Sequence, residues 1–443
     1  MKPSSSMSSA WEAIFNERTR LQRMLDFEAA LARAESVCGV IPETASEPIA
    51  RCTKAELFDA REIASAALQA GNPAIPLVKS LMAEVKAIDT EAARYVHWGA
   101  TSQDAMDTGL VLQLRDALHL VDKELQTLCA ILAKLADAHR ATPLAARTWM
   151  QQAIPTTLGL KFAGYLDALH RHRVRIAAAR ERILVLQFGG AAGSLAALGD
   201  KGLQVSAALA ADLQLALPAV PWHTERDRVA EVATLFGLLM GTLGKMARDI
   251  SLMVQSEVSE AAEPAAEGRG GSSTMPHKRN PVSCAAILAA AVRVPGLVST
   301  MLSAMVQEHE RALGGWQAEW ETLPQIICLT GESLERMTAL MVGLGINSGR
   351  MLANLEITHG LIYAESAAML LAKQLGKAAA HDLIEKASAQ ATKEKKHLRD
   401  VLLDNAQVRS NFTNDDIAGL FKPGAYSGMA DEFVTRAIQT FKE

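Results

Sequence analysis

The chain has 443 residues and a formal net charge of −4, and this length suffices for two or three domains with a sizeable buried core. Hydrophobic residues make up 49% of it and aromatic residues only 5%, and the abundance of Ala and Leu favours helices over sheets. The charge argues against nucleic-acid binding, so an anionic substrate needs a local basic pocket, and five cysteines without a CxxC pair predict free thiols and no metal site.

The N-terminal part of the chain predicts a small helical domain over residues 1–103. Its first residues are polar and are not followed by the apolar segment of a signal peptide, so we expect a cytoplasmic protein that does not contact a membrane. Apolar side chains recur at helical spacing over residues 13–37. The helical patterns that follow are short because Gly39, Pro42 and Pro48 interrupt them.

Five long helical patterns occupy the middle of the chain, where apolar residues recur every three or four positions. They cover about residues 104–135, 156–186, 229–253, 282–312 and 317–344. The apolar stripe of the third pattern runs into Glu257 and Glu260, which indicates that this end of the helix is polar and functional. No stretch alternates convincingly between apolar and polar residues, so we expect strands to be minor.

These patterns predict an all-α protein. We expect a central bundle of five long helices over residues 104–349, flanked by smaller helical domains over residues 1–103 and 350–443. Several long patterns carry more apolar residues than one helix face can bury. Such faces are commonly buried against copies of the same chain, so the patterns favour a homo-oligomer.

The segment of residues 95–104 leads into the first long helix and ends with Thr101-Ser102-Gln103-Asp104. Thr101 and Ser102 stand where helix N-caps belong, and Asp104 lies in the first turn. One interpretation is a well-formed helix start with no further role. The other is an anion site, because a helix N-terminus with two hydroxyls and His97 nearby suits a carboxylate.

A polar, glycine-rich loop interrupts the long apolar helices over residues 268–281. Its centre reads Gly-Gly-Ser-Ser-Thr-Met-Pro-His-Lys-Arg-Asn-Pro. Glycines let backbone N–H groups approach an anion, and the hydroxyls, Lys278 and Asn280 can stabilise negative charge that develops on a substrate. The alternative is a solvated linker. A nucleotide P-loop is excluded, because no Gly-Lys-Ser/Thr stands at the required spacing.

Both segments resemble signature blocks of the fumarase/aspartase superfamily, and the likeness extends over about residues 15–403. The resemblance implies that Thr101 and Ser102 hold a substrate carboxylate with His97 close by. It also implies that Ser272 transfers a proton. Because three motif blocks lie near the ends of separate long helices that carry excess apolar residues, we expect a homotetramer whose active sites combine segments of different subunits. We expect no cofactor or metal. The loop residues that the resemblance places around the substrate besides Ser272 are Ser273, Met275, Lys278 and Asn280.

Two further blocks depart from the amine-eliminating members of this superfamily. Trp149 stands where they have the His that protonates the leaving amine, although Gln151 is kept, and core packing is the alternative role for Trp149. Arg311 is kept as a substrate-binding candidate, but Ala312 and Trp316 replace the Asp and Ser that adenylosuccinate lyases use around their nucleotide. For two arginines of another matching stretch, surface charge and substrate contact both remain open; they are Arg226 and Arg228.

At these positions the chain resembles the lactonising branch of the superfamily, whose members cyclise carboxylated muconates. In the reverse of lactonisation the leaving group is a carboxylate of pKa about 4, which departs without protonation, whereas an amine needs a proton. The resemblance therefore implies a cycloisomerase acting on a small polycarboxylate, with Trp149 as an apolar wall. The alternatives are a β-eliminating lyase like adenylosuccinate lyase and a non-catalytic descendant of the kind found among lens crystallins.

Overall fold

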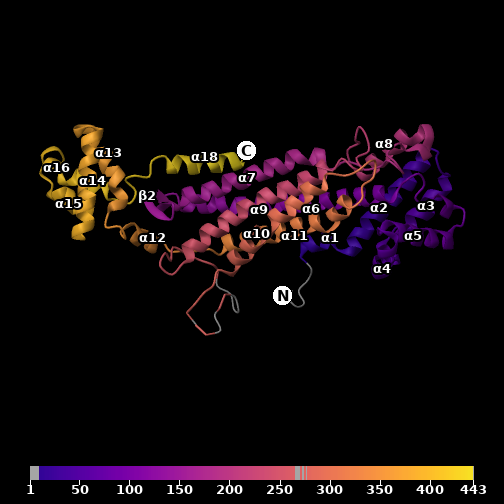
Figure 1. The fold of residues 1–443 in the computed structure, drawn as a ribbon, viewed down its shortest axis with the longest axis horizontal. Helices are drawn as coiled ribbons and strands as arrows, with labels where there is room; N and C mark the ends of the chain where they lie inside the picture. Colours follow the sequence, from indigo (N-terminus) through magenta and orange to yellow (C-terminus); the bar gives the residue numbers. More distant parts are fainter. Residues whose placement is uncertain (1–8, 265–269, 272–273, 276, 443) are drawn as a thin grey trace. The chain divides into compact units, whose positions relative to one another are not determined.

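The structure is a computed structural model that describes residues 9–264, 270–271, 274–275 and 277–442. These residues form eighteen α-helices and four short strands, which confirms the all-α class predicted from the sequence (Figure 1). The five longest helices have 23 to 37 residues, and each matches one of the predicted long patterns. They are α6 (Ser102–Ala138), α7 (Leu158–Ile183), α9 (Asp227–Val254), α10 (Val282–Ala304) and α11 (Gly315–Val342).

α10 ends earlier than the sequence pattern predicts, and α9 ends before the acidic residues that were expected to continue its stripe; the backbone gives the reason in both cases. α10 ends at Ala304 rather than near residue 312, and the segment after it contains the left-handed residues His309 (φ 53°) and Gly314 (φ 95°). α9 ends at Val254, and Ser259 beyond it is left-handed (φ 51°). The sequence pattern predicted that the α9 stripe continues into Glu257 and Glu260. This prediction is wrong, because both residues lie beyond the end of the helix.

The chain forms two compact units. Unit 1 comprises Met1–Glu124, His172–Gly241 and Ala289–Glu335, and unit 2 comprises Leu125–Arg171, Thr242–Leu288 and Arg336–Glu443. Each of the five long helices contributes residues to both units. The shorter helices and the strands belong to one unit or the other. The three-part division at residues 103 and 349 stays a prediction.

Unit 1 contains the short N-terminal helices. A buried cluster runs from Leu21 and Met24 on α2 through the following helices to Trp316 on α11, and it holds these elements together. The short elements of unit 1 are α1 (Ala10–Phe15), α2 (Glu17–Val37), α3 (Glu43–Cys52), η1 (Ala55–Leu57), α4 (Ala60–Ala70), α5 (Ala74–Ile88), η2 (Ala92–Tyr95), η3 (Ala196–Lys201) and α8 (Gly202–Leu213).

Unit 2 contains all four strands, in two small antiparallel pairs, β1 with β2 and β3 with β4. Its C-terminal helices α13 to α16 lie together (Figure 1) around a core that includes Leu371 and Leu402. Its short elements are β1 (Pro143–Thr148), β2 (Gln151–Thr157), β3 (Ala261–Ala262), β4 (Gly345–Ile346), α12 (Ser348–Leu355), η4 (Leu361–Tyr363), α13 (Ala364–Leu375), α14 (Lys377–Glu394), α15 (Leu398–Asp404), α16 (Ala406–Asn411), α17 (Asn414–Leu420) and α18 (Ala430–Lys442).

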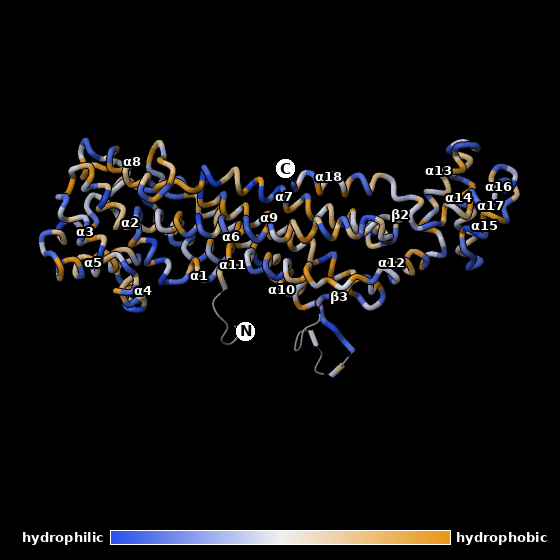
Figure 2. Tube along the Cα trace, turned by 180° about the vertical axis from the view of Figure 1, so that it is seen from behind, coloured by the Kyte–Doolittle hydropathy of each residue, from blue (hydrophilic) through white to orange (hydrophobic). Residues whose placement is uncertain are grey.

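Hydrophobic residues recur along the long helices (Figure 2). On α10, three large ones are exposed: Val282, Val292 and Leu302. By length and composition alone, α9 and α10 are apolar enough to cross a membrane. The apolar window of α9 is 56% buried, as in a core helix, but that of α10 is only 28% buried. Val292 on α10 is 81% exposed, so this helix presents an apolar face that the described part of the chain does not cover.

Candidate active site

The start of α6 is fixed by Asp104, as the capping pattern of the sequence predicts. The Thr101 N–H donates to Asp104 Oδ2 (3.0 Å), and the Asp104 N–H donates back to the Thr101 carbonyl (2.9 Å). The chain reaches this point through His97 (φ 58°) and Gly99 (φ 69°), both left-handed. A Cβ at Gly99 would lie 2.6 Å from Leu198 Cδ2, so glycine is required there.

Asp104 also ties the helix start to the Gln-Phe-Gly-Gly segment of residues 187–190. Its Oδ1 accepts from the Gly189 N–H (3.0 Å), from Gln187 Nε2 (3.2 Å) and from His223 Nε2 (2.8 Å). Its Oδ2 accepts from the Gly190 N–H (2.9 Å). Asp104 is fully buried, so this carboxylate is a rigid anchor and does not face a ligand.

Arg311 lies against the N-terminus of α6. Its Nη1 donates to Thr101 Oγ1 (2.6 Å), its Nη2 to Ser102 Oγ (3.4 Å) and its Nε to Gln103 Oε1 (3.3 Å). Since both hydroxyl oxygens accept from Arg311, their O–H groups remain able to donate to another oxygen. A guanidinium, two hydroxyl donors and the N-terminus of a long helix together suit a carboxylate.

His97 completes this group of donors, which we call the α6 cluster (His97, Thr101, Ser102 and Arg311). Its Nδ1 lies 2.6 Å from Glu28 Oε1 on α2. Burial of the ring disfavours its charged form, but the Glu28 carboxylate outweighs this effect and raises the pKa of His97. The α6 cluster thus collects the unit 1 residues that the sequence predicted for substrate binding.

Arg226 has neither of the roles that the sequence left open for it. It is 2% exposed and forms bidentate ion pairs with Asp107 (2.7 and 3.0 Å) and with Glu319. A buried cation between two carboxylates is a structural link between α6, α9 and α11. Arg228, at the start of α9, is half-buried and donates to the Arg182 carbonyl.

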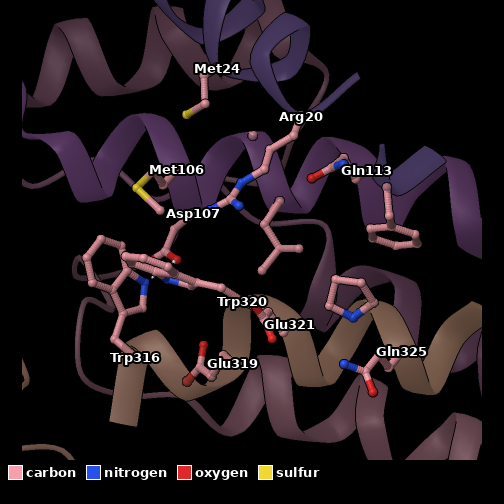
Figure 3. Close-up of a pocket in the computed structure, with 14 residues that line it drawn as sticks. Arg20, Met24, Met106, Asp107, Gln113, Trp316, Glu319, Trp320, Glu321 and Gln325 are labelled. Carbon is pink, nitrogen blue, oxygen red and sulfur yellow. Dashed lines mark hydrogen bonds between the residues drawn. The ribbon is translucent and has the colours of Figure 1, made fainter. Parts of the chain in front are cut away.

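A cavity of about 330 Å³ in unit 1 opens beside this ion pair, between α2, α6 and α11. Figure 3 shows Met24 and Arg20 pointing toward it from one side and the α11 side chains from the other. Trp316 closes it: its Nε1 donates to Asp107 Oδ1 (3.1 Å) and its ring packs edge-on against Trp320. None of the α6 cluster lines this cavity, and Trp316 is part of the core.

The unit 2 candidates lie on the hairpin of β1 and β2. Thr148 pairs with Gln151, so Trp149 and Met150 form a two-residue connection, and both have positive φ (52° and 64°). That is the pattern of type I′ turns, which favour Asn and Gly and strain bulky residues. Trp149 is 98% exposed and Met150 72% exposed, so the core-packing role is wrong for Trp149.

The base of this hairpin is rigid. Arg147 on β1 makes a bidentate pair with Glu260 (2.7 and 3.0 Å), which is fully buried, and Asn354 donates to the same carboxylate (2.8 Å). Glu260 therefore supports the hairpin and the β3 strand. A pocket of about 380 Å³ beside it is lined by residues that include Arg147, Trp149, Lys161 and Asp249.

The glycine-rich loop is also in unit 2. Its base is closed where the Asn280 N–H donates to the Gly270 carbonyl (2.8 Å), and Glu263 accepts from the N–H groups of Ser283 and Cys284 at the start of α10. Lys278 is exposed, as is Met275 at 40%. Ser272 and Ser273, the predicted proton-transfer residues, lie outside the described residues.

The sequence missed two groups that organise the site. Glu28 lies within the apolar stripe of α2, between Leu25 and Ala32, and a carboxylate in such a stripe is a detectable signal. The partners of Arg226 gave no such signal, since nothing in the sequence places Asp107 near Glu319. In the described ranges no three His, Cys, Asp or Glu side chains are grouped to hold a metal ion, and the absence of a cofactor stays a prediction.

Comparison with known proteins places the chain in a family. Residues 4–296 match the family described as Lyase, and residues 360–437 match the adenylosuccinate lyase C-terminus. A 3-carboxy-cis,cis-muconate cycloisomerase of Pseudomonas aeruginosa is 55% identical, over 98% of this chain and 94% of that protein. One from Bradyrhizobium diazoefficiens is 51% identical over 98% and 96%.

A solved structure is similar over the same extent. The 3-carboxy-cis,cis-muconate lactonizing enzyme of Pseudomonas putida has a TM-score of 0.94 and 50% identity, over 98% of this chain and 97% of that chain. The sequence likeness and the fold agree with the blocks around Thr101 and in the glycine-rich loop. The chain therefore belongs to the lyase family, within the fumarase/aspartase superfamily.

Proposed function

We propose that the protein lactonises 3-carboxy-cis,cis-muconate to 4-carboxymuconolactone, a step of protocatechuate degradation in the β-ketoadipate pathway. The observation that carries the proposal is Trp149, an exposed apolar side chain where amine-eliminating lyases have a proton-donating His. The relatives named as cycloisomerases, which are 55% and 51% identical over nearly the whole chain, support it.

The reaction needs charge stabilisation and one proton. A carboxylate oxygen of the substrate forms a C–O bond to one carbon of a double bond, whose electron pair moves to the neighbouring carbon. That carbanion is delocalised into its own carboxylate, and a proton then bonds to the carbon. Fixed donors around that carboxylate stabilise the transition state, because they need no reorganisation as its charge grows.

We assign the carboxylate-binding role to the α6 cluster. Arg311 supplies a fixed positive charge, Thr101 and Ser102 supply O–H donors, and the helix N-terminus adds its dipole. The rigid anchor at Asp104 supports this role, since donors that are held before the substrate arrives lose little entropy when it binds.

We assign the proton transfer to Ser272, supported by Ser273. A serine hydroxyl is a weak acid and a weak base, so it can move a proton only where its anion is stabilised. Lys278 and Asn280, from the same loop, suit that task. Met275 and Gln151 complete the proposed substrate contacts.

The proposed reaction explains why a Trp can stand at position 149 in place of a proton-donating His. Cyclisation forms a bond from a carboxylate, whose conjugate acid has a pKa of about 4, so this group also departs unprotonated in the reverse direction and no general acid is required where other lyases protonate an amine. An apolar wall there excludes water from the reacting diene. A nucleotide substrate is disfavoured as well, because Ala312 and Trp316 pack into the N-terminal core of unit 1 and offer no polar contact to a base or phosphate.

We further propose a homotetramer in the cytoplasm whose active sites combine segments of different subunits. The exposed apolar face of α10, with Val292 81% and Leu302 48% exposed, supports burial against another copy. The hairpin tip (Trp149 and Met150) supports the shared site, since strained and exposed apolar residues fit a role in contact with another molecule.

A substrate comparison tests the proposed reaction. Purified protein is given 3-carboxy-cis,cis-muconate, and loss of the ultraviolet absorbance of the diene reports lactonisation. Adenylosuccinate is given in a parallel assay, where formation of fumarate reports the lyase. We expect turnover of the muconate only, since a missing general acid alone costs about 10²- to 10⁴-fold. Fumarate release at ordinary enzymatic rates with no loss of the diene would instead establish the β-eliminating lyase.

A further inference from the structure

Glu28 is a buried acid beside His97, and the proposed reaction steps do not use it. It lies on the apolar side of α2, and its side chain is 1% exposed. Its Oε1 faces the Nδ1 of His97 at 2.6 Å, and its Oε2 has no hydrogen-bond partner among the described residues. A buried carboxylate with one unpaired oxygen is costly unless an adjacent cation balances its charge. Among the residues that the structure describes, His97 is the group placed to do so at this distance.

The geometry of His97 fixes which of its nitrogens serves the site. Nδ1 faces Glu28, so Nε2 lies on the far side of the ring, and the side chain is 16% exposed. The left-handed backbone at His97 holds the ring in this place, two residues before the left-handed Gly99. The charged groups that act on His97 are Glu28 from α2 and Asp104 from α6, and both favour the imidazolium.

We infer that Glu28 is a positioning residue of the active site, which holds His97 as an imidazolium whose Nε2–H is presented to a carboxylate of the substrate. The inference rests on the proposed function only in naming that carboxylate as the ligand. A second acid on α2 offers a matched comparison. Glu35 is fully buried, and neither of its carboxylate oxygens has a hydrogen-bond partner among the described residues. It lies two turns along the helix from Glu28, so it forms no hydrogen bond with the described residues of the α6 cluster.

The inference has a chemical consequence for the α6 cluster. Arg311 and an imidazolium together provide two positive charges for an anionic substrate, while Asp104 is already saturated by backbone and side-chain donors. A Glu28→Gln substitution keeps the size and an acceptor oxygen but removes the charge. Neutral His97 then still has its hydrogen bond to residue 28 and lacks the positive charge toward the substrate.

The first experiment follows the ionisation of His97 without any turnover. Histidine is labelled with ¹³C at Cε1, and the His97 signal is assigned by its absence from a His97→Asn variant. We expect its titration midpoint in Glu28→Gln to lie at least about one pH unit below that in the unchanged protein. In Glu35→Gln the midpoint should stay close to that of the unchanged protein. Equal midpoints in the Glu28→Gln and unchanged proteins would overturn the inference, whatever the protein catalyses.

The second experiment uses lactonisation. In Glu28→Gln we expect kcat/KM to fall on the order of 10²-fold and the alkaline limb of its pH profile to move to lower pH, because His97 then loses its proton more easily. Glu28→Asp, which keeps the charge, should keep the position of that limb even if kcat falls. A fall in kcat/KM with an unmoved limb in Glu28→Gln indicates a purely structural role and contradicts the inference. If Glu28→Gln does not fold, the Glu28→Asp titration decides: a His97 midpoint as low as that of free histidine also contradicts it.

Discussion

The two regions that carry the candidate site are built in opposite ways. At the start of α6 in unit 1, the polar groups are held by one another: Asp104 accepts from the Thr101, Gly189 and Gly190 N–H groups, and Arg311 donates to the α6 hydroxyls. At the hairpin tip in unit 2, two large apolar side chains stand exposed on a left-handed backbone. The first region is complete before a substrate arrives. In the second region, the exposed and strained residues do not stabilise the fold of their own chain.

This difference separates two kinds of contribution to function. A preorganised cluster stabilises charge with little loss of entropy on binding. An exposed apolar tip contributes only when something covers it, which in our proposal is the site of another subunit. Substitutions at the hairpin tip should therefore lower activity without lowering the free energy of unfolding. Substitutions in the buried network of unit 1 should lower the free energy of unfolding.

The largest effect is expected in the glycine-rich loop. Ser272→Ala should lower kcat by several powers of ten while substrate binding changes by a few-fold at most, because the variant lacks the group that moves the proton. Steady-state kinetics with 3-carboxymuconate measures both. Ser256→Ala, an exposed serine on the N-terminal side of the loop, is the control and should keep normal rates. Near-normal turnover in Ser272→Ala would assign the proton transfer to Ser273 or another group.

The next largest effect is on stability in unit 1. Arg226→Met leaves Asp107 and Glu319 buried without their cation, and breaking such a pair costs about 3–5 kcal/mol. Urea denaturation followed by circular dichroism measures the free energy of unfolding. Arg228→Met, at the half-buried arginine two residues along, should change it by less than about 1 kcal/mol. Equal effects of the two substitutions would show that the buried ion pair does not stabilise unit 1.

A smaller effect of opposite sign is expected at the hairpin tip. Trp149→Asn combined with Met150→Gly gives the sequence that type I′ turns prefer, so folding stability should rise by about 1 kcal/mol. The same protein should lose about 10- to 100-fold in kcat/KM, because the apolar wall is gone. Trp149→Phe keeps an apolar ring and should retain most activity. A double variant that is both more stable and fully active would show that the hairpin tip is not part of the active site.

The smallest effect concerns Glu35. Burial, and next the charge of Glu28, raises the pKa of Glu35 to about 9. The folded state thus retains a proton that the unfolded state releases near pH 4.5, and stability falls as pH rises from there toward 9. Glu35→Gln should remove that part of the pH dependence and raise the melting temperature by a few degrees at pH 8. A melting temperature that responds to pH equally in both proteins would contradict this account.

The sequence predicted those features that a local pattern determines. The apolar spacing located all five long helices, and Thr101-Ser102-x-Asp104 marked the start of α6 correctly. It missed the hairpin, because β1 and β2 are short and Trp149-Met150 lacks the Asn and Gly that usually mark such a turn. It also left Arg226 open, since its partners are about ninety and more residues away in the chain and only the fold brings them together.

A complementation experiment tests the shared site most directly. Two inactive proteins are prepared, Ser272→Ala, which damages the loop, and Thr101→Val with Ser102→Ala, which damages the α6 cluster. They are mixed, partly unfolded and reassembled, and hybrid oligomers are confirmed by native mass spectrometry. If different subunits supply the loop and the cluster, some sites in the hybrids contain two intact segments, and lactonisation returns to a substantial fraction of the unchanged rate. Confirmed hybrids that stay inactive, or a chain that is monomeric by light scattering, would contradict the account.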